Sequence, residues 1–187
     1  MVNWILNKLS VDNEEDYDKI IDKLTTDNEV DFNNIIPMPD YIYKRDLGPE
    51  ERRLYGEKNN WYDWSINNWG VKWNASNTYI LNDGIYFDTP WSGVPELIHE
   101  LSQMFPNSTI EYKFASEDMF MNTGKFIFNG ENIQGGYHNW NYSSYKLYND
   151  LWGKDPYYDY RVYVTRDRLN IVRVDIVRKL LCPVRRL

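Results

Sequence analysis

The spacing of apolar side chains changes along the first part of the chain. From Asn3 to Val11 they fall at roughly every second position, which predicts a strand. From Asn13 to Thr26 they recur every three to four residues, which predicts a helix with one buried stripe. Asp12 and Glu15 have the spacing of a capping box at the start of this helix. Strand-like residues from Val30 to Ile36 predict a second strand.

The same patterns resume after residue 77. Asn82-Asp83-Gly84 tolerates positive φ and predicts a hairpin turn. Apolar positions from Val94 to Phe105 predict the clearest helix of the chain, with Ser92 as its cap. Other expected elements are strands at 78–81, 85–88, 109–114, 119–128 and 134–139, turns at Asn129-Gly130 and Gly135-Gly136, and a helix at 143–152 that ends at Gly153.

The order of these elements indicates the fold class. Strand, helix, strand, insertion, strand pair, helix and two strands make a split β-α-β pattern with the helices on one face of an antiparallel sheet. The sequence therefore predicts an α+β fold of the ferredoxin-like class, with a Trp-rich helical insertion and an extra C-terminal element.

Residues 40–77 interrupt the regular pattern, because four tryptophans fall within thirteen residues there. We expect three parts: a ferredoxin-like core at 1–39 and 78–141, an inserted lobe at 40–77, and a basic extension at 142–187. In the extension, residues 157–164 suit a strand, whereas residues 169–181 suit either a helix or a strand.

Composition narrows the class of protein. Hydrophobic residues make up 42% and aromatics 17% of 187 residues, which excludes a wholly disordered chain. No run approaches the length of a membrane span. Cys182 is the only cysteine, so a disulfide framework and a cysteine-based zinc site are excluded, and we expect a cytoplasmic location in a host cell.

Charge is distributed unevenly along the chain. Residues 1–150 hold 12 basic and 24 acidic side chains, and residues 151–187 hold 9 and 4. An acidic body repels nucleic acid, whereas a basic tail can attract it or fold back on the body.

Several motifs resemble a known family. They are Asn3 to Leu9, Phe32 to Pro39, Trp61 to Asn74, Phe87 to Ser92, and Gly135-Gly136. Together they resemble the YubB-type ferredoxin-like domain family of plasmids, phages and other mobile elements. The resemblance implies a ferredoxin-like fold with a helical insertion, and it implies no catalytic activity.

The resemblance has limits. A second proline expected after Trp91-Ser92 is delayed to Pro95, and nothing after about Tyr142 matches the family. "Ferredoxin-like" names a chain topology here, because a single cysteine cannot ligate an iron–sulfur cluster.

Motifs for catalysis are not found in the sequence. His99-Glu100 begins a metalloprotease-like pattern, but Gln103 stands where the second histidine would be. His99 and His138 would have to converge to hold a metal. Cys182 has apolar neighbours that favour an inert thiol. We therefore expect a protein that is not an enzyme and has no metal or cofactor.

A tryptophan cluster allows two interpretations. Its residues are Trp61, Tyr62, Trp64, Trp69, Lys72 and Trp73. The rings can form a stacking surface for bases or sugars, or the core of a lobe that is poor in Leu, Ile and Val. The second interpretation is favoured, and Lys72 is then expected over one of the rings as a cation–π partner.

The first functional hypothesis is a non-catalytic mobile-element protein that binds and inhibits a host macromolecule. A CRISPR nuclease, its ribonucleoprotein or another defence enzyme is the concrete case. Carboxylates can occupy a nucleic-acid channel that Arg and Lys line, as a nucleic-acid mimic. The expected residues are Asp12, Glu14, Glu15, Asp16, Asp18 and Asp22.

The second hypothesis is a nucleic-acid-binding module. Its basic residues are Arg161, Arg166, Arg168, Arg173, Arg178, Lys179, Arg185 and Arg186, with tyrosines among them. Arginine suits phosphate because its planar fork donates two parallel hydrogen bonds. The same residues can instead cover the acidic body, within one chain or across a dimer. No membrane partner is expected.

Overall fold

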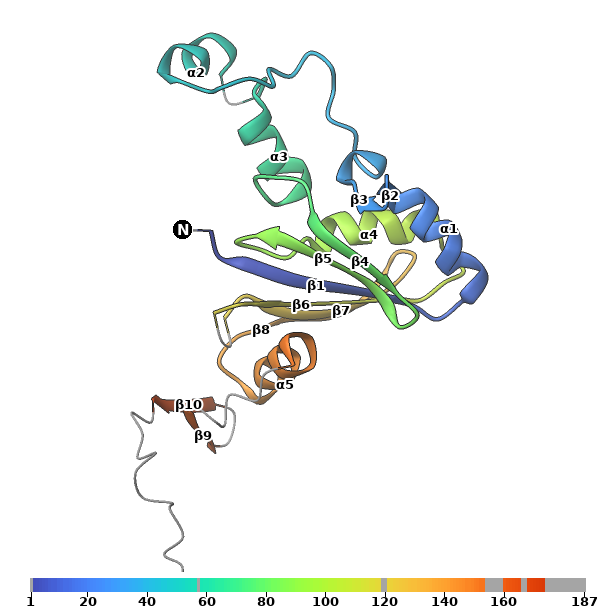
Figure 1. The fold of residues 1–187 in the computed structure, drawn as a ribbon, viewed down its shortest axis with the longest axis vertical. Helices are drawn as coiled ribbons and strands as arrows, with labels where there is room; N and C mark the ends of the chain where they lie inside the picture. The colour runs from blue at the N-terminus through green and yellow to red at the C-terminus, as the bar shows by residue number, and fades with distance from the viewer. Residues whose placement is uncertain (1, 57, 119–120, 154–159, 166–167, 174–187) are drawn as a thin grey trace, which may run out of the picture.

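In the computed structural model, the described residues are 2–56, 58–118, 121–153, 160–165 and 168–173, the last two ranges as backbone only. Their centre is one six-stranded antiparallel sheet with the order β4-β5-β1-β6-β7-β8 (Figure 1). The strands are β1 (Trp4–Val11), β4 (Ser76–Leu81), β5 (Gly84–Pro90), β6 (Ile110–Ser116), β7 (Thr123–Asn129) and β8 (Asn132–His138).

The first four strands of the sheet have ferredoxin-like topology. β1 is antiparallel to β5 and β6, and β4 is antiparallel to β5. β1 and β4 therefore run parallel with β5 between them, which is the split β-α-β unit. β7 and β8 extend the sheet beyond β6 as a hairpin. The predicted α+β ferredoxin-like fold is confirmed.

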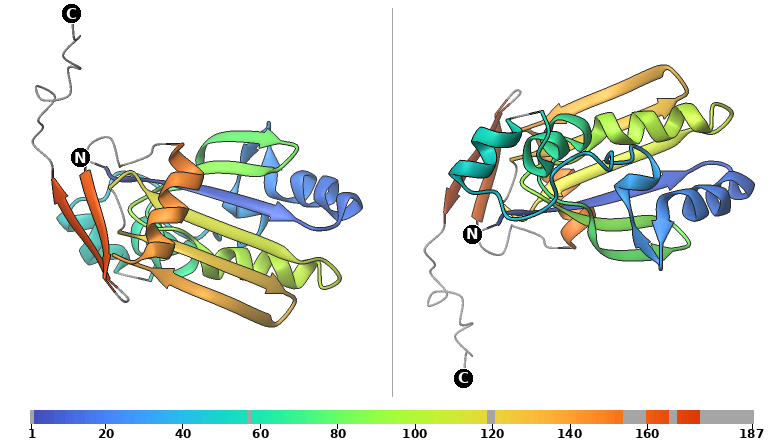
Figure 2. Two further views of the ribbon diagram at one scale, coloured as in Figure 1. Left: turned by 90° about the horizontal axis from the view of Figure 1, so that it is seen from below. Right: turned by 90° about the horizontal axis from the view of Figure 1, so that it is seen from above.

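Helices cover both faces of the sheet. α1 (Glu14–Leu24) and α4 (Pro95–Met104) lie on one face, and α5 (Tyr142–Trp152) lies on the other (Figure 2). Trp152 of α5 donates its indole N–H to the Ala115 carbonyl of β6 at 3.1 Å. α2 (Pro49–Tyr55) and α3 (Trp61–Trp69) form the helical insertion, and α2 lies farthest from the sheet (Figure 1).

The face beneath α1 and α4 contains a buried polar network. The side-chain amide of Asn7 donates to the Phe87 carbonyl at 3.0 Å and to the Thr89 hydroxyl at 2.9 Å. The Tyr112 hydroxyl donates to the Asn7 carbonyl oxygen at 2.6 Å and accepts from the Val94 amide at 2.7 Å. Burial raises the pKa of Tyr112 well above its usual value, so the phenol stays neutral. The network fixes the start of α4 on the sheet.

Several predicted details at turns and caps are wrong. Residues 30–36 are not one strand, because β3 (Glu29–Val30) pairs only with β2 (Thr25–Thr26) and a 3₁₀ helix follows at Phe32–Asn34. Gly135-Gly136 lies inside β8, where a Cβ on Gly135 would come within 2.2 Å of the Lys125 carbonyl oxygen. The glycine therefore serves close strand pairing rather than a turn.

Two predicted helix caps are also corrected. Asn13 rather than Asp12 caps α1, and its side-chain oxygen accepts from the Glu15 amide at 3.0 Å. Val94 occupies the cap position of α4 without a side-chain bond, because the Ser92 hydroxyl donates to the Gly93 carbonyl instead. Pro95 needs no N–H partner at the first helical position, which lessens the need for a cap.

In the C-terminal extension, β9 (Tyr160–Thr165) and β10 (Arg168–Arg173) form an antiparallel pair. The strand predicted at 157–164 therefore begins at Tyr160, and residues 157–159 lie outside the described residues. Of the ambiguous range 169–181, the part to Arg173 is strand and the rest also lies outside them.

Candidate functional site

The outward side of α1 carries exposed carboxylates. Ile20 and Leu24 are buried against the sheet, which fixes the opposite side of the helix toward solvent. Of the six acidic residues expected to form a binding surface, five are exposed and Asp16 is half-buried.

Asp12 and Asp16 bind the chain itself. Asp12 accepts a hydrogen bond from the Thr109 amide at 2.8 Å, and Asp16 accepts from the Ser108 hydroxyl at 2.5 Å. Lys19 lies 2.8 Å from the other Asp16 oxygen. The hydrogen bonds from Lys19 and Ser108 lower the pKa of Asp16. These two carboxylates anchor α1 to the start of β6.

The remaining four form what we call the acidic surface: Glu14, Glu15, Asp18 and Asp22. Glu14, Asp18 and Asp22 follow one another at four-residue intervals, so they form a row along the helix. Within the part of the chain that the structure describes, none of the four has a carboxylate hydrogen bond or ion pair. Their charge is therefore available to a partner.

Two tryptophans of the cluster are buried, as the favoured interpretation expects, but in the core of the sheet rather than in a separate core of the lobe. Trp64 and Trp69 are 9% and 6% exposed and join the core of the sheet. Trp69 packs edge-on against Phe32 with ring centroids 5.9 Å apart, and its indole N–H donates to the Ile36 carbonyl at 2.9 Å. These rings hold α3 on the sheet.

Trp61 is half-buried and packs against this core, whereas Trp73 faces outward. Trp73 is 38% exposed and lies 5.4 Å from Trp91, which is 40% exposed. The Lys72 ammonium lies 4.4 Å from the Trp73 centroid, 5.5 Å from that of Tyr62, and 5.9 Å from those of Trp61 and Trp91. The expected cation–π contact is confirmed, and it involves four rings rather than one.

Lys72 is positioned by the end of α3. Gly70 adopts a left-handed conformation with φ of 80° and ends the helix. Val71 is then buried, and the Ser65 hydroxyl donates to the Lys72 carbonyl at 2.8 Å. The backbone of Lys72 is thereby held against α3 while its side chain extends over the rings.

Trp91 follows β5 in an unusual conformation. Its φ is 62°, in the left-handed region that a residue with a bulky side chain rarely adopts. Its amide donates to the Asn3 carbonyl at 2.8 Å, and its carbonyl accepts from the Asn122 amide at 3.3 Å. The ring is thereby held beside Trp73.

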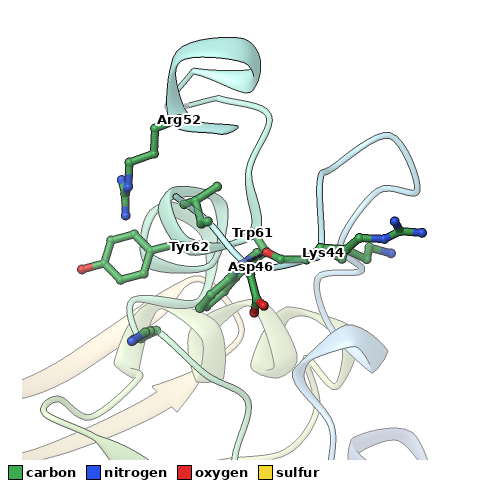
Figure 3. Close-up of a pocket in the computed structure, with 8 residues that line it drawn as sticks. Lys44, Asp46, Arg52, Trp61 and Tyr62 are labelled. Atoms are coloured by element: carbon green, nitrogen blue, oxygen red, sulfur yellow. Dashed lines mark hydrogen bonds between the residues drawn. The ribbon is translucent and has the colours of Figure 1, made fainter. Parts of the chain in front are cut away.

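Two adjoining hollows open beside these rings. One, of about 320 Å³, lies between α2, α3 and the preceding loop (Figure 3). The other, of about 300 Å³, lies between α3 and the end of β5. They share Tyr62 and Lys72, and Trp91 lines the second; Trp73 lines neither but packs beside Trp91 and under Lys72. We call the two hollows, together with the Trp73 ring, the aromatic cleft.

Basic side chains predominate in the first hollow, which four of them and one carboxylate line. Arg52 points from α2 toward the Tyr62 ring, with its guanidinium carbon 5.2 Å from the centroid (Figure 3). Lys44 extends away from that ring and lies 3.6 Å from Asp40. Arg52 and Lys72 therefore face the rings, and Arg52 also lies 3.6 Å from the Asp63 carboxylate.

Arg52 and Trp91 were not expected at this site, whereas Tyr62 was expected among its rings. Arg52 lies in α2 and Trp91 follows β5. Because they are far apart in the sequence, the spacing of apolar residues could not predict that they meet. The one sequence signal was that Trp91 stands in Phe87 to Ser92, one of the motifs on which the resemblance rests.

His99 and His138 are the remaining candidates from the sequence within the described residues. His99 stacks on Phe128 with ring centroids 5.6 Å apart. Among the residues that the structure describes, no three His, Cys, Asp or Glu side chains are grouped so as to hold a metal ion. No helix in the same part of the chain is long and apolar enough to cross a membrane.

The basic residues of the C-terminal extension cannot be placed in a site. Arg161, Arg168 and Arg173 belong to β9 and β10, whose side chains lie outside the described part. The residues that lie entirely outside the described part are Arg166, Arg178, Lys179, Cys182, Arg185 and Arg186.

Comparison with known proteins supports the fold. Residues 68–150 match a family described as the ferredoxin-like domain in Api92-like protein. The match runs from the end of α3 through α5, so it includes Lys72, Trp73 and Trp91 but not α1. No curated protein and no solved structure matches the chain.

Proposed function

We propose that this is a non-catalytic protein of a mobile element that binds and inhibits a host nucleic-acid-binding protein through the acidic surface. The observation that carries the proposal is the row Glu14, Asp18 and Asp22, exposed on a helix whose other side is buried. The YubB-type resemblance of Trp61 to Asn74 supports the mobile-element origin. A host defence nuclease, such as a CRISPR nuclease, is the partner class that this origin favours.

The charge of the surrounding surface supports the same partner. Residues 12–31 contain nine acidic and two basic side chains. Carboxylates spaced along a rigid helix can replace phosphates in a channel lined with Lys and Arg. Such a partner releases nucleic acid when this protein binds, and binding weakens as salt rises.

The test is a charge reversal that leaves α1 intact. Asp18→Lys with Asp22→Lys changes two exposed carboxylates beyond the first helical turn, where a cation does not oppose the helix dipole. Wild-type and variant proteins are used to capture partners from nuclease-treated bacterial host lysate. Each captured protein is then titrated in a nucleic-acid displacement assay. We expect a partner that loses its nucleic acid to the wild type and binds the variant about tenfold or more weakly.

A matched control changes the same charge elsewhere. Glu131→Lys with Asp150→Lys alters two exposed carboxylates on other elements and should leave capture unchanged. If both double variants weaken partner binding equally, net charge and not the acidic surface determines the binding. If Asp18→Lys with Asp22→Lys leaves the affinity for the partner unchanged, the acidic surface is not the binding site.

A further inference from the structure

The aromatic cleft is a basic site on an acidic body. Residues 1–150 contain twice as many acidic as basic side chains, yet basic side chains outnumber acidic ones at the first hollow of the cleft. A local excess of positive charge of this kind attracts an anionic ligand even when the whole molecule is acidic.

Lys72 has no anionic partner in the described part of the chain. The ammonium is held only by the faces of aromatic rings, the nearest of which is Trp73 at 4.4 Å. By contrast, Lys8, Lys19, Lys44, Lys113 and Lys125 each have a carboxylate within 4.0 Å. Lys72 therefore keeps its donors available for an anion.

The exposure of the rings beside Lys72 is energetically unfavourable. Trp73 and Trp91 each leave more than a third of their surface in water, and Trp91 does so from a left-handed backbone. Trp64 and Trp69, by comparison, bury their rings in the core. Backbone strain of this kind persists where the surrounding structure holds it, and it is frequent at ligand sites.

The cation that the rings already hold restricts the ligand. Rings around a cation often form a cage for quaternary ammonium ligands. Here the Lys72 ammonium lies on those rings, so a second cation would meet like charge. A neutral sugar would leave the positive charge of Lys72 without a partner. A ligand with both a planar ring and an anionic group matches both features of the cleft.

We propose that the aromatic cleft binds a nucleotide, with its base stacked on Trp73 or Trp91 and its phosphate held by Lys72 and Arg52. Base–aromatic stacking with basic side chains along the backbone is how proteins hold single strands without reading sequence. Hollows of about 320 and 300 Å³ have room for such a group. The site differs from the acidic surface and does not depend on it.

Binding is tested on the full chain with labelled single-stranded oligothymidylate, monitored by fluorescence anisotropy. We expect saturable binding that Trp73→Ala weakens by about five- to a hundredfold, the value of one stacked base. Lys72→Gln should weaken it by about fivefold and make the salt dependence shallower. The basic extension is present in every variant, so its contribution cancels in the comparison.

Two matched controls separate the cleft from general effects. Tyr79→Ala removes an exposed ring of β4 that is 61% exposed and outside the cleft. Lys146→Gln removes an ammonium that lies 5.3 Å from the Tyr142 ring on α5. Neither control should change affinity more than about twofold. A thermal melt of each variant checks that the fold is kept.

Further arms distinguish the source of the nucleotide. Competition by thymidine monophosphate at a similar affinity per site assigns the cleft to a free nucleotide, and competition only by the oligomer assigns it to a single strand. Both results support the proposal. Equal binding of blunt duplex, or no loss with Trp73→Ala and Lys72→Gln, overturns it. Poly-glutamate that binds equally well and loses affinity in the same variants would assign the cleft to an acidic protein segment and also overturn it.

Discussion

The sheet with α1 and the inserted lobe bury their apolar side chains in different ways, and each leaves a different surface exposed. The core under α1 is built from aliphatic and phenylalanine side chains, so the helix needs only the stripe of Ile20 and Leu24. The remaining positions of α1 are free to carry charge. Five exposed carboxylates on one short segment are the result.

The lobe has little aliphatic material and uses tryptophan on both of its sides. Trp64 and Trp69 face the core, whereas Trp73 lies outward beside Trp91. The same residue type therefore serves packing on one side and an accessible ring surface on the other. The comparison teaches that composition alone does not separate a core tryptophan from a binding one.

The largest expected effect separates the two kinds of tryptophan. Trp69→Ala should destabilise the fold by about 3–5 kcal/mol, because it removes a buried ring and its hydrogen bond to Ile36. Trp73→Ala should cost about 1 kcal/mol or less, since its ring is largely outside the core. Chemical denaturation measures both. Similar losses would mean that Trp73 contributes to the core as much as Trp69 does.

Sequence patterns predicted the elements better than their connections. Periodicity found β1, α1 and α4, because each has a stripe of apolar positions, and the turn residues Asn82-Asp83-Gly84 found the β4–β5 hairpin. The residues from Val30 to Ile36 misled it, because the β-branched side chains lie on either side of a 3₁₀ turn at Phe32–Asn34. In that turn the Asp31 carboxylate accepts a hydrogen bond from the Asn33 backbone amide at 2.9 Å. A local side-chain bond of this kind leaves no periodic signal.

The candidate sites were predicted unequally for the same reason. A helix brings Glu14, Asp18 and Asp22 into one row by its own period, so the acidic surface could be read from sequence. The aromatic cleft needs α2, the end of α3 and the residue after β5 to meet. Only the tertiary fold brings Arg52, Lys72 and Trp91 together.

A smaller effect tests how α1 is anchored. The pKa of Asp16 is lowered in the folded protein from its ordinary value of 3.8, so ionised Asp16 stabilises the fold. This contribution is complete above that ordinary value and is lost as pH falls through the lower folded value. Asp16→Asn keeps an oxygen that can accept from Ser108 but removes the charge. We therefore expect its melting temperature to fall below that of the wild type at pH 6, with the difference closing below about pH 4.

Asp18→Asn is the matched control for this pH series, because its carboxylate is exposed and has no such bonds in the described residues. Its melting temperature should follow that of the wild type across the series. A gap for Asp16→Asn that stays constant down to pH 3 would show that packing, and not charge, anchors the helix to β6.

The smallest effect concerns the backbone beneath the exposed rings. Trp91→Gly and Trp73→Gly remove neighbouring rings of nearly equal exposure, 40% and 38%, and both give the unfolded chain the extra freedom of glycine. Only Trp91 has a left-handed φ, which costs a non-glycine residue roughly 1 kcal/mol or more. Trp91→Gly should therefore be about 1 kcal/mol more stable than Trp73→Gly, while each weakens oligonucleotide binding. Equal stability would show that Trp91 adopts its conformation without strain, and the argument that a ligand site maintains it would lose its support.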